Sequence, residues 1–156
     1  MKQDYVINRI RLKELREALS LVSKVFLEYE APDYCDEGIA EFMKFIEYAA
    51  IRQKLGKREF LMWTCKADEE IVGVLATRPP CHISLLFVAG EHQRRGIARC
   101  LLATVRDYYK THYNYKEITV NSSPYAIAVY HRLGFKDISG EQTVNGIRFV
   151  PMRRSL

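Results

Sequence analysis

The chain has 156 residues, enough for one domain spanning residues 1–156 with a buried core. Its 48% hydrophobic and 28% charged residues are ordinary for a globular protein and exclude a disordered or coiled-coil chain. No apolar run approaches the roughly 18 residues of a membrane span, and the first residues lack the apolar stretch of a signal peptide. The four cysteines show no paired metal spacing. We interpret them as reduced thiols of a cytoplasmic protein that binds no metal and no membrane.

The net charge of +5 is unevenly distributed along the chain. Residues 81–156 contain eleven Lys or Arg and five Asp or Glu, a balance of +6, whereas residues 1–80 carry −1. Within the first part, residues 28–47 contain seven acidic residues and a single cation, Lys44. One half of the chain therefore suits an anionic ligand, and a segment of the other half suits a cation. The basic residues lack an interleaved aromatic platform, so a nucleic-acid partner is not expected.

The first half of the chain predicts a short strand, two helices and a hairpin. Residues 5–7 read as a strand. Apolar residues recur at three- and four-residue steps over residues 11–28 and again over 36–54, which predicts two amphipathic helices separated at Pro32. Residues 60–66 and 71–77 are strand-like and are joined by a polar turn, so they predict a hairpin.

The second half alternates between strands and helices. Residues 82–88 predict a fourth strand, 96–112 a third helix and 117–121 a fifth strand. Pro124 suits the first turn of a fourth helix that ends near Gly134. Residues 135–138 and 147–152 predict closing strands, with a turn at Val144-Asn145-Gly146. The predicted order is βααβββαβαββ.

The connection between the fourth strand and the third helix has the composition of an anion site. It reads Gln93-Arg94-Arg95-Gly96-Ile97-Ala98, followed by Arg99. The first backbone N–H groups of a helix have no partners within the helix, and the helix dipole favours negative charge there. A phosphate or pyrophosphate is the natural guest of such a turn. The alternative is that these arginines are simply solvated at the start of a helix.

A second segment supports the phosphate interpretation. A strand ending at Asn121 is followed by Ala126-Ile127-Ala128-Val129-Tyr130-His131-Arg132-Leu133-Gly134-Phe135. Here the chain resembles the GCN5-related N-acetyltransferase (GNAT) family. That family carries a Gln/Arg-x-x-Gly-x-Gly/Ala turn and, about 25 residues later, an Ala-x-x-x-Tyr-x-x-x-Gly-Phe helix. The resemblance covers roughly residues 70–152. Gly90, where many relatives have Pro, and Ala98, where Gly is commoner, depart from the pattern without removing an amide from the turn.

The resemblance implies a fold and a co-substrate. The expected fold is of the α/β (α+β) class, a mixed sheet of six to seven strands with about four helices, in which the parallel fourth and fifth strands splay apart. Acetyl-CoA would lie in this wedge. Its pantetheine arm would bond the backbone of Leu86, Phe87 and Val88 like an added strand, with Asn121 orienting the arm. Its pyrophosphate would lie on the amides of residues 93–98, beside Arg99.

The resemblance also places Tyr130 at the family's general-acid position. A phenol with a pKa near 10 can supply a proton to a departing thiolate, whose thiol has a pKa of about 8.5. The alternative is a core tyrosine bonded to a carbonyl. The base that activates the amine is less defined. His82 opens the fourth strand and has a suitable intrinsic pKa, so we name it as a catalytic candidate. Further candidates for the base are Ser84, Glu28, Glu30 and Glu47.

The acceptor is expected to bind the connection between the first two helices. Glu28, Glu30, Asp33 and Tyr34 could hold a small cationic amine by charge and cation–π contacts. An ordinary acidic helix start is an equal alternative. The sequence thus predicts an acetyl-CoA-dependent N-acetyltransferase that acetylates a primary amine within a ternary complex. A silent acyl-CoA-binding regulatory module and an enzyme acting on protein N-termini or lysines are the alternatives. Dimers are common in the family, so a homodimer stays open.

Overall fold

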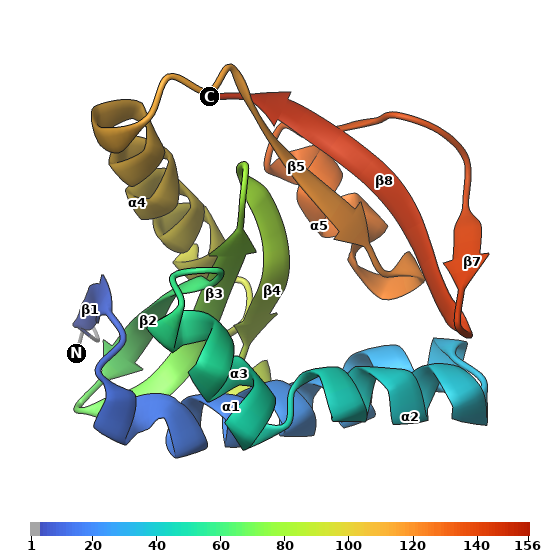
Figure 1. Ribbon diagram of the computed structural model, residues 1–156, viewed down its shortest axis with the longest axis horizontal. Coiled ribbons are helices and arrows are strands. Elements are labelled where there is room, and N and C mark those ends of the chain that lie inside the picture. The colour runs from blue at the N-terminus through green and yellow to red at the C-terminus, as the bar shows by residue number, and fades with distance from the viewer. Residues whose placement is uncertain (1–3) are drawn as a thin grey trace.

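The computed structural model describes residues 4–156, which form a mixed β-sheet covered by helices (Figure 1). The strands are β1 (Tyr5–Arg9), β2 (Leu61–Ala67), β3 (Glu70–Arg78), β4 (His82–Val88), β5 (Glu117–Ser122), β6 (Lys136–Asp137), β7 (Gln142–Val144) and β8 (Ile147–Ser155). The α-helices are α1 (Leu15–Val25), α2 (Asp36–Phe45), α3 (Tyr48–Gly56), α4 (Ile97–His112) and α5 (Ile127–Arg132). Short turns include a π-helical turn η2 (Phe26–Glu30) and the 3₁₀ turns η1 (Leu12–Glu14), η3 (Ala31–Asp33), η4 (Gly90–His92) and η5 (Pro124–Ala126). None of the helices in this described region is long and apolar enough to cross a membrane.

The strand order in the sheet is β1-β2-β3-β4-β5-β8-β6, with β7 paired to the far end of β8. Neighbours are antiparallel except β4 and β5, which run parallel. The predicted α/β fold class and the hairpin of β2 and β3 are therefore confirmed.

The parallel strands β4 and β5 separate after two residue pairs. His82 pairs with Thr119 and Ile83 with Val120, and the pairing ends there. On its other edge, β4 continues beside β3, where Ala76 faces Leu85 and Thr77 faces Ile83, so that Ser84 is an extra residue in β4. Such a bulge bends its strand. Figure 1 shows β4 and β5 diverging, with α1 and α2 lying across the open end. The expected splay is confirmed.

Two hydrophobic cores hold the helices to the sheet. On one face, α4 and α5 bury Leu101, Leu102, Val105 and Tyr130 against the sheet. On the other face, α1, η2 and α3 bury their apolar stripes against alternate residues of β3 and β4, which include Leu85 and Phe87. The alternation of side chains along each strand supplies both faces at once. This division leaves the wedge between β4 and β5 at the meeting point of the two cores.

The structure differs from the predicted elements in two places. The helix expected over 36–54 is two helices, because Glu47 adopts an extended backbone with ψ of 138°. The break changes the chain direction so that Ile46 and Ile51 are both buried in the same core, which a continuous helix pattern does not reveal. The closing region also contains the additional strand β7. Asn145 and Gly146 have φ of 53° and 79°, the paired left-handed geometry of a tight hairpin turn, so the predicted turn at residues 144–146 is confirmed.

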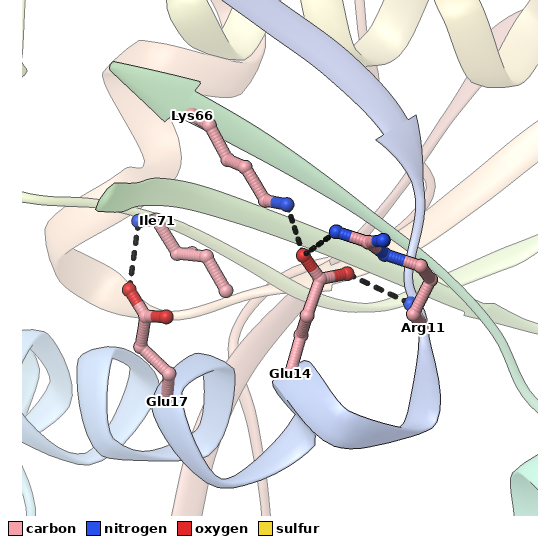
Figure 2. A network of polar contacts seen from close by, with 5 residues as sticks. All are labelled: Arg11, Glu14, Glu17, Lys66 and Ile71. Atoms are coloured by element: carbon pink, nitrogen blue, oxygen red, sulfur yellow. Dashed lines mark hydrogen bonds and ion pairs between the residues drawn. The ribbon is translucent and has the colours of Figure 1, made fainter. Parts of the chain in front are cut away.

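A buried carboxylate fastens α1 to the sheet (Figure 2). Glu14 is 8% exposed and accepts hydrogen bonds from the backbone N–H of Arg11 at 2.9 Å, from the Arg11 guanidinium and from Lys66 on β2. One turn later, Glu17 accepts the N–H of Ile71 at 2.9 Å. Burial alone would raise the pKa of Glu14, but the bonds from Lys66 and Arg11 lower it to about 2. The network therefore connects α1 with both strands of the central hairpin.

Candidate active site

A cavity of about 320 Å³ lies where β4 and β5 separate. Its walls come from both cores: the ends of η2 and α2, the strands β4 and β5, the turn η5, helix α5 and the β7–β8 hairpin. Among the residues with predicted roles, the lining includes Glu30, Tyr34, His82, Leu86, Phe87, Asn121 and Tyr130. The structure therefore brings together side chains separated by up to 100 positions in the sequence.

Tyr130 comes from α5 and is 5% exposed. Its ring packs edge-on against Phe135, with 5.4 Å between the ring centroids. Burial raises the pKa of the Tyr130 phenol, and the nearby negative charge of Glu30 raises it further. The phenol is therefore protonated at neutral pH.

Glu30 is the last residue of η2 and shares the cavity with Tyr130. Removal from water raises the pKa of its carboxyl group to about 7, an effect that a hydrogen bond from Ser123 opposes and the charge of Asp33 reinforces. Ser123 is the N-cap of η5, so the bond joins η2 to the start of the segment that carries Tyr130. A carboxyl group with this pKa exchanges protons readily near neutral pH.

His82 lines the opposite wall at the closed end of the fork. Its Nδ1 lies 2.8 Å from the Thr119 hydroxyl on β5. Burial lowers the pKa of His82 to about 4, and the neighbouring Arg78 contributes to the decrease. The imidazole is therefore neutral at physiological pH and weakly basic. Beside it, the Ser84 hydroxyl is buried without a hydrogen-bond partner among the described residues.

The backbone of β4 beyond Ile83 faces the wedge. β3 occupies one edge of Leu86, Phe87 and Val88, and no described strand pairs with the other edge. The carbonyl of Val88 accepts a hydrogen bond from the Gln93 side chain at 3.1 Å. Across the wedge, Asn121 on β5 is exposed and lines the cavity. Leu86 and Phe87 line the cavity, whereas Val88 does not.

The basic turn has the geometry of a helix start open to solvent. Gly96 is the N-cap of α4 with φ of 82°, and Arg94 also has a positive φ of 62°. The first amides of α4, including Ile97 and Ala98, follow this cap. The side chains of Arg95 and Arg99 reach the Tyr5 hydroxyl and the carbonyl of Arg132, respectively. Arg94, Arg95 and Arg99 are all exposed, so their charges are open to an anion in solvent.

The residues expected to bind the acceptor fall into two groups. Glu30 and Tyr34 line the cavity, whereas Glu28 and Asp33 are exposed and do not. The Tyr34 hydroxyl donates to the carbonyl of Arg148 at 3.2 Å, so Tyr34 presents its ring, which stacks on Phe26. Asp33 offers its backbone carbonyl to the Arg148 guanidinium at 2.9 Å. These two residues anchor the helical connection to β8.

Sequence reasoning missed part of the cavity wall. The helical pattern of the second helix includes Phe42, Glu41 belongs to the acidic segment, and Phe45, Arg78 and Phe149 have no predicted role. All five line the cavity. The signal in the sequence was the three-residue spacing of Phe42 and Phe45 within the acidic segment, but this spacing is equally typical of a core helix.

Comparisons with known proteins identify the family. An acetyltransferase (GNAT) domain model matches residues 30–156. The human protein N-acetyltransferase 8 is 30% identical over 94 residues, which cover 53% of this chain and 41% of the human protein. The chain thus spans less than half of that relative.

Two solved structures share the fold. One is the PaiA N-acetyltransferase of Thermoplasma acidophilum in complex with coenzyme A, with a TM-score of 0.81, 15% identity and coverage of 98% of this chain and 99% of that one. The other is a GCN5-related N-acetyltransferase of Rhodopseudomonas palustris, with a TM-score of 0.82, 17% identity and coverage of 100% and 99%. With the family model matching most of its length, the chain belongs to the GNAT family of acetyltransferases.

Proposed function

We propose that this protein is an acetyl-CoA-dependent N-acetyltransferase that transfers the acetyl group to a primary amine. The observation that carries the proposal is the cavity at the fork of β4 and β5, which holds a protonated phenol, Tyr130, and a carboxyl group with a pKa near neutrality, Glu30. Family membership and the coenzyme A complex of the Thermoplasma relative support the choice of co-substrate.

Acetyl-CoA would bind to backbone groups of β4 and of the turn that follows it. The free edge of Leu86, Phe87 and Val88 can pair with the two amides of a pantetheine arm. The pyrophosphate would lie at the N-terminus of α4, where the amides of residues 93–98 and the charges of Arg94, Arg95 and Arg99 favour an anion. Asn121, which lines the cavity from β5, would bond the arm from the opposite side.

The chemistry then requires two proton transfers. The amine nitrogen attacks the thioester carbonyl carbon, and the carbon–sulfur bond breaks. We assign removal of the amine proton to Glu30, because its pKa of about 7 is closer to the operating pH than that of His82, at about 4. Tyr130 gives its phenolic proton to the leaving sulfur. The proton that Glu30 took from the amine then passes through solvent to the Tyr130 phenolate, which restores both groups. The products are the N-acetylated amine and the CoA thiol.

His82 has a different role from the catalytic one expected from the sequence. As a neutral ring bonded to Thr119, it joins β4 to β5 at the first of the two paired positions, one residue before the strands separate. It would orient the fork and could hold a water molecule together with Ser84, whose hydroxyl lacks a protein partner among the described residues. We therefore propose a positioning role for His82.

The test is acetyl-CoA consumption, measured as thiol release, across a panel of amines, amino acids and peptides, with CoA binding measured in parallel by calorimetry. Amine-dependent thiol release establishes the transferase. Tight CoA binding without release on any acceptor would favour the regulatory module instead. Release with peptides alone would favour an enzyme of protein N-termini or lysines.

A further inference from the structure

We propose that the acceptor amine of this enzyme carries an aromatic ring, or an apolar group of similar size, bound against Phe42, Phe45 and Phe149. This inference rests on the proposed N-acetyltransferase function and names the substrate class of the same site. It narrows the expectation of a small cationic amine, which the acidic composition of residues 28–47 suggested.

The acceptor half of the cavity has an aromatic wall. Phe42 and Phe45 come from α2 and Phe149 from β8, and all three side chains are partly exposed while lining the cavity. Phe26 also lines the cavity but is almost fully buried, as is Phe60, which lies outside the lining. Three phenyl rings open to one cavity are suited to an aromatic guest, because offset and edge-on ring pairs add to the gain from apolar burial.

Two neighbouring rings fix the position of Phe42. The rings of Phe42 and Phe26 stack with 3.9 Å between their centroids and 20° between their planes. Phe42 also contacts Phe87 on β4, at 5.9 Å between centroids, which joins the wall to the strand proposed to hold pantetheine. A ring lying on Phe42 would thus be placed in the cavity that also contains Glu30 and Tyr130.

The charges of the lining disfavour a polyamine. Among the described lining residues, only Glu30 and Glu41 carry carboxylates, and Arg78 is a cation in the same wall. Glu28 and Asp33, which could have held further ammonium groups, lie outside the cavity. One carboxylate suffices for the reacting amine, whereas each additional ammonium would be desolvated against an apolar wall.

The size of the cavity also favours a small, single-ring acceptor. Its volume of about 320 Å³ is at the low end of the roughly 300–1,000 Å³ of small-molecule sites. The acetyl thioester must share that space with the acceptor. A single-ring arylalkylamine fits this restriction better than a polycyclic or oligomeric amine.

The experiment compares kcat/KM for 2-phenylethylamine, n-butylamine and spermidine at saturating acetyl-CoA. We expect 2-phenylethylamine to exceed both others by at least about tenfold, a difference of about 1.4 kcal/mol. In Phe149→Leu, which keeps an apolar side chain but removes the ring, the value for 2-phenylethylamine should fall about tenfold and that for n-butylamine less than about twofold.

Tyr113→Leu is the matched control, since it removes an exposed ring outside the cavity and should change neither value. Unchanged melting temperature and CoA affinity would show that Phe149→Leu is folded. Turnover with spermidine or n-butylamine equal to that with 2-phenylethylamine would overturn the inference and leave the transferase intact. An equal loss for both monoamines in Phe149→Leu would also overturn it. Absence of turnover with every amine would overturn the proposed function itself.

Discussion

The contact between Gly38 and Gly146 sets the position of α2 over the acceptor side of the cavity. A Cβ built on Gly38 would lie 2.2 Å from the carbonyl oxygen of Gly146 and 2.7 Å from its carbonyl carbon. Gly146 belongs to the β7–β8 turn, whose neighbours Asn145 and Ile147 line the cavity. In Gly38→Ala the helix and the hairpin must therefore move apart, because neither contacting atom belongs to a flexible side chain.

The displacement and its cost can be worked out from this geometry. Ordinary Cβ contacts begin at 3.4 Å, so the two backbones must separate by about 1.2 Å. Overpacking of this kind costs about 1–3 kcal/mol, and the higher helix propensity of alanine returns about 1 kcal/mol. The free energy of unfolding should fall by no more than about 2 kcal/mol. A misplacement of about 1 Å in an active site can reduce the rate up to about a hundredfold, so we expect acceptor kcat/KM to fall ten- to a hundredfold.

The assay is thiol release with the best amine of the panel, together with calorimetric CoA binding and urea unfolding. CoA affinity should stay within about twofold, because the basic turn before α4 is formed by other elements. Gly56→Ala is the matched control. Gly56 is the last residue of α3, and a Cβ there meets no atom within 4 Å. That variant should keep wild-type kinetics and gain up to about 1 kcal/mol of stability.

Two results would refute this reasoning. Wild-type acceptor kinetics in Gly38→Ala would mean that the β7–β8 hairpin yields without altering the site. A parallel loss of CoA affinity and acceptor turnover would mean that the substitution disturbs the whole sheet and not the acceptor wall alone.

The remaining predictions concern single residues of the site and the scaffold. Since Glu30 must be ionised to act as a base, kcat/KM should fall as the pH drops below about 7. Glu30→Gln should abolish this pH dependence and reduce the rate at least about a hundredfold. A pH–rate profile of the wild type and the variant tests both expectations. Tyr130→Phe should reduce kcat about a hundredfold with acetyl-CoA affinity within about twofold, and wild-type turnover would transfer the proton-donor role elsewhere. Gly96→Val places a β-branched residue at a φ of 82°, so calorimetry should show CoA binding at least about tenfold weaker. The pKa of Glu14 falls from 4.5 to about 2 on folding, so its ionised carboxylate stabilises the fold fully above pH 4.5, and this stabilisation is lost towards pH 2. In urea unfolding, Glu14→Gln should therefore lower the free energy of unfolding by up to about 3 kcal/mol at pH 7 and by much less at pH 3.

The order of elements and the family were accessible from the sequence. Periodicity located nearly every strand and helix, because each amphipathic stripe is a local property of consecutive residues. The turn at residues 93–98 and the helix around Tyr130 were recognisable for a similar reason. A helix start that binds an anion, and a tyrosine within one helical segment, depend on short stretches of chain.

The composition of the cavity was decided by tertiary structure. Nothing in the local pattern distinguishes Glu30, which enters the cavity, from Glu28, which stays in solvent two residues earlier, since the distinction depends on the π-helical turn and its contact with η5. The break at Glu47 likewise follows from the burial of Ile46 and Ile51 together. The sequence by itself determined the order of the elements and the basic turn before α4, because both are built from neighbouring residues. Only the fold determined which carboxylate is desolvated and which phenylalanines line the cavity, because both depend on atoms supplied by distant segments.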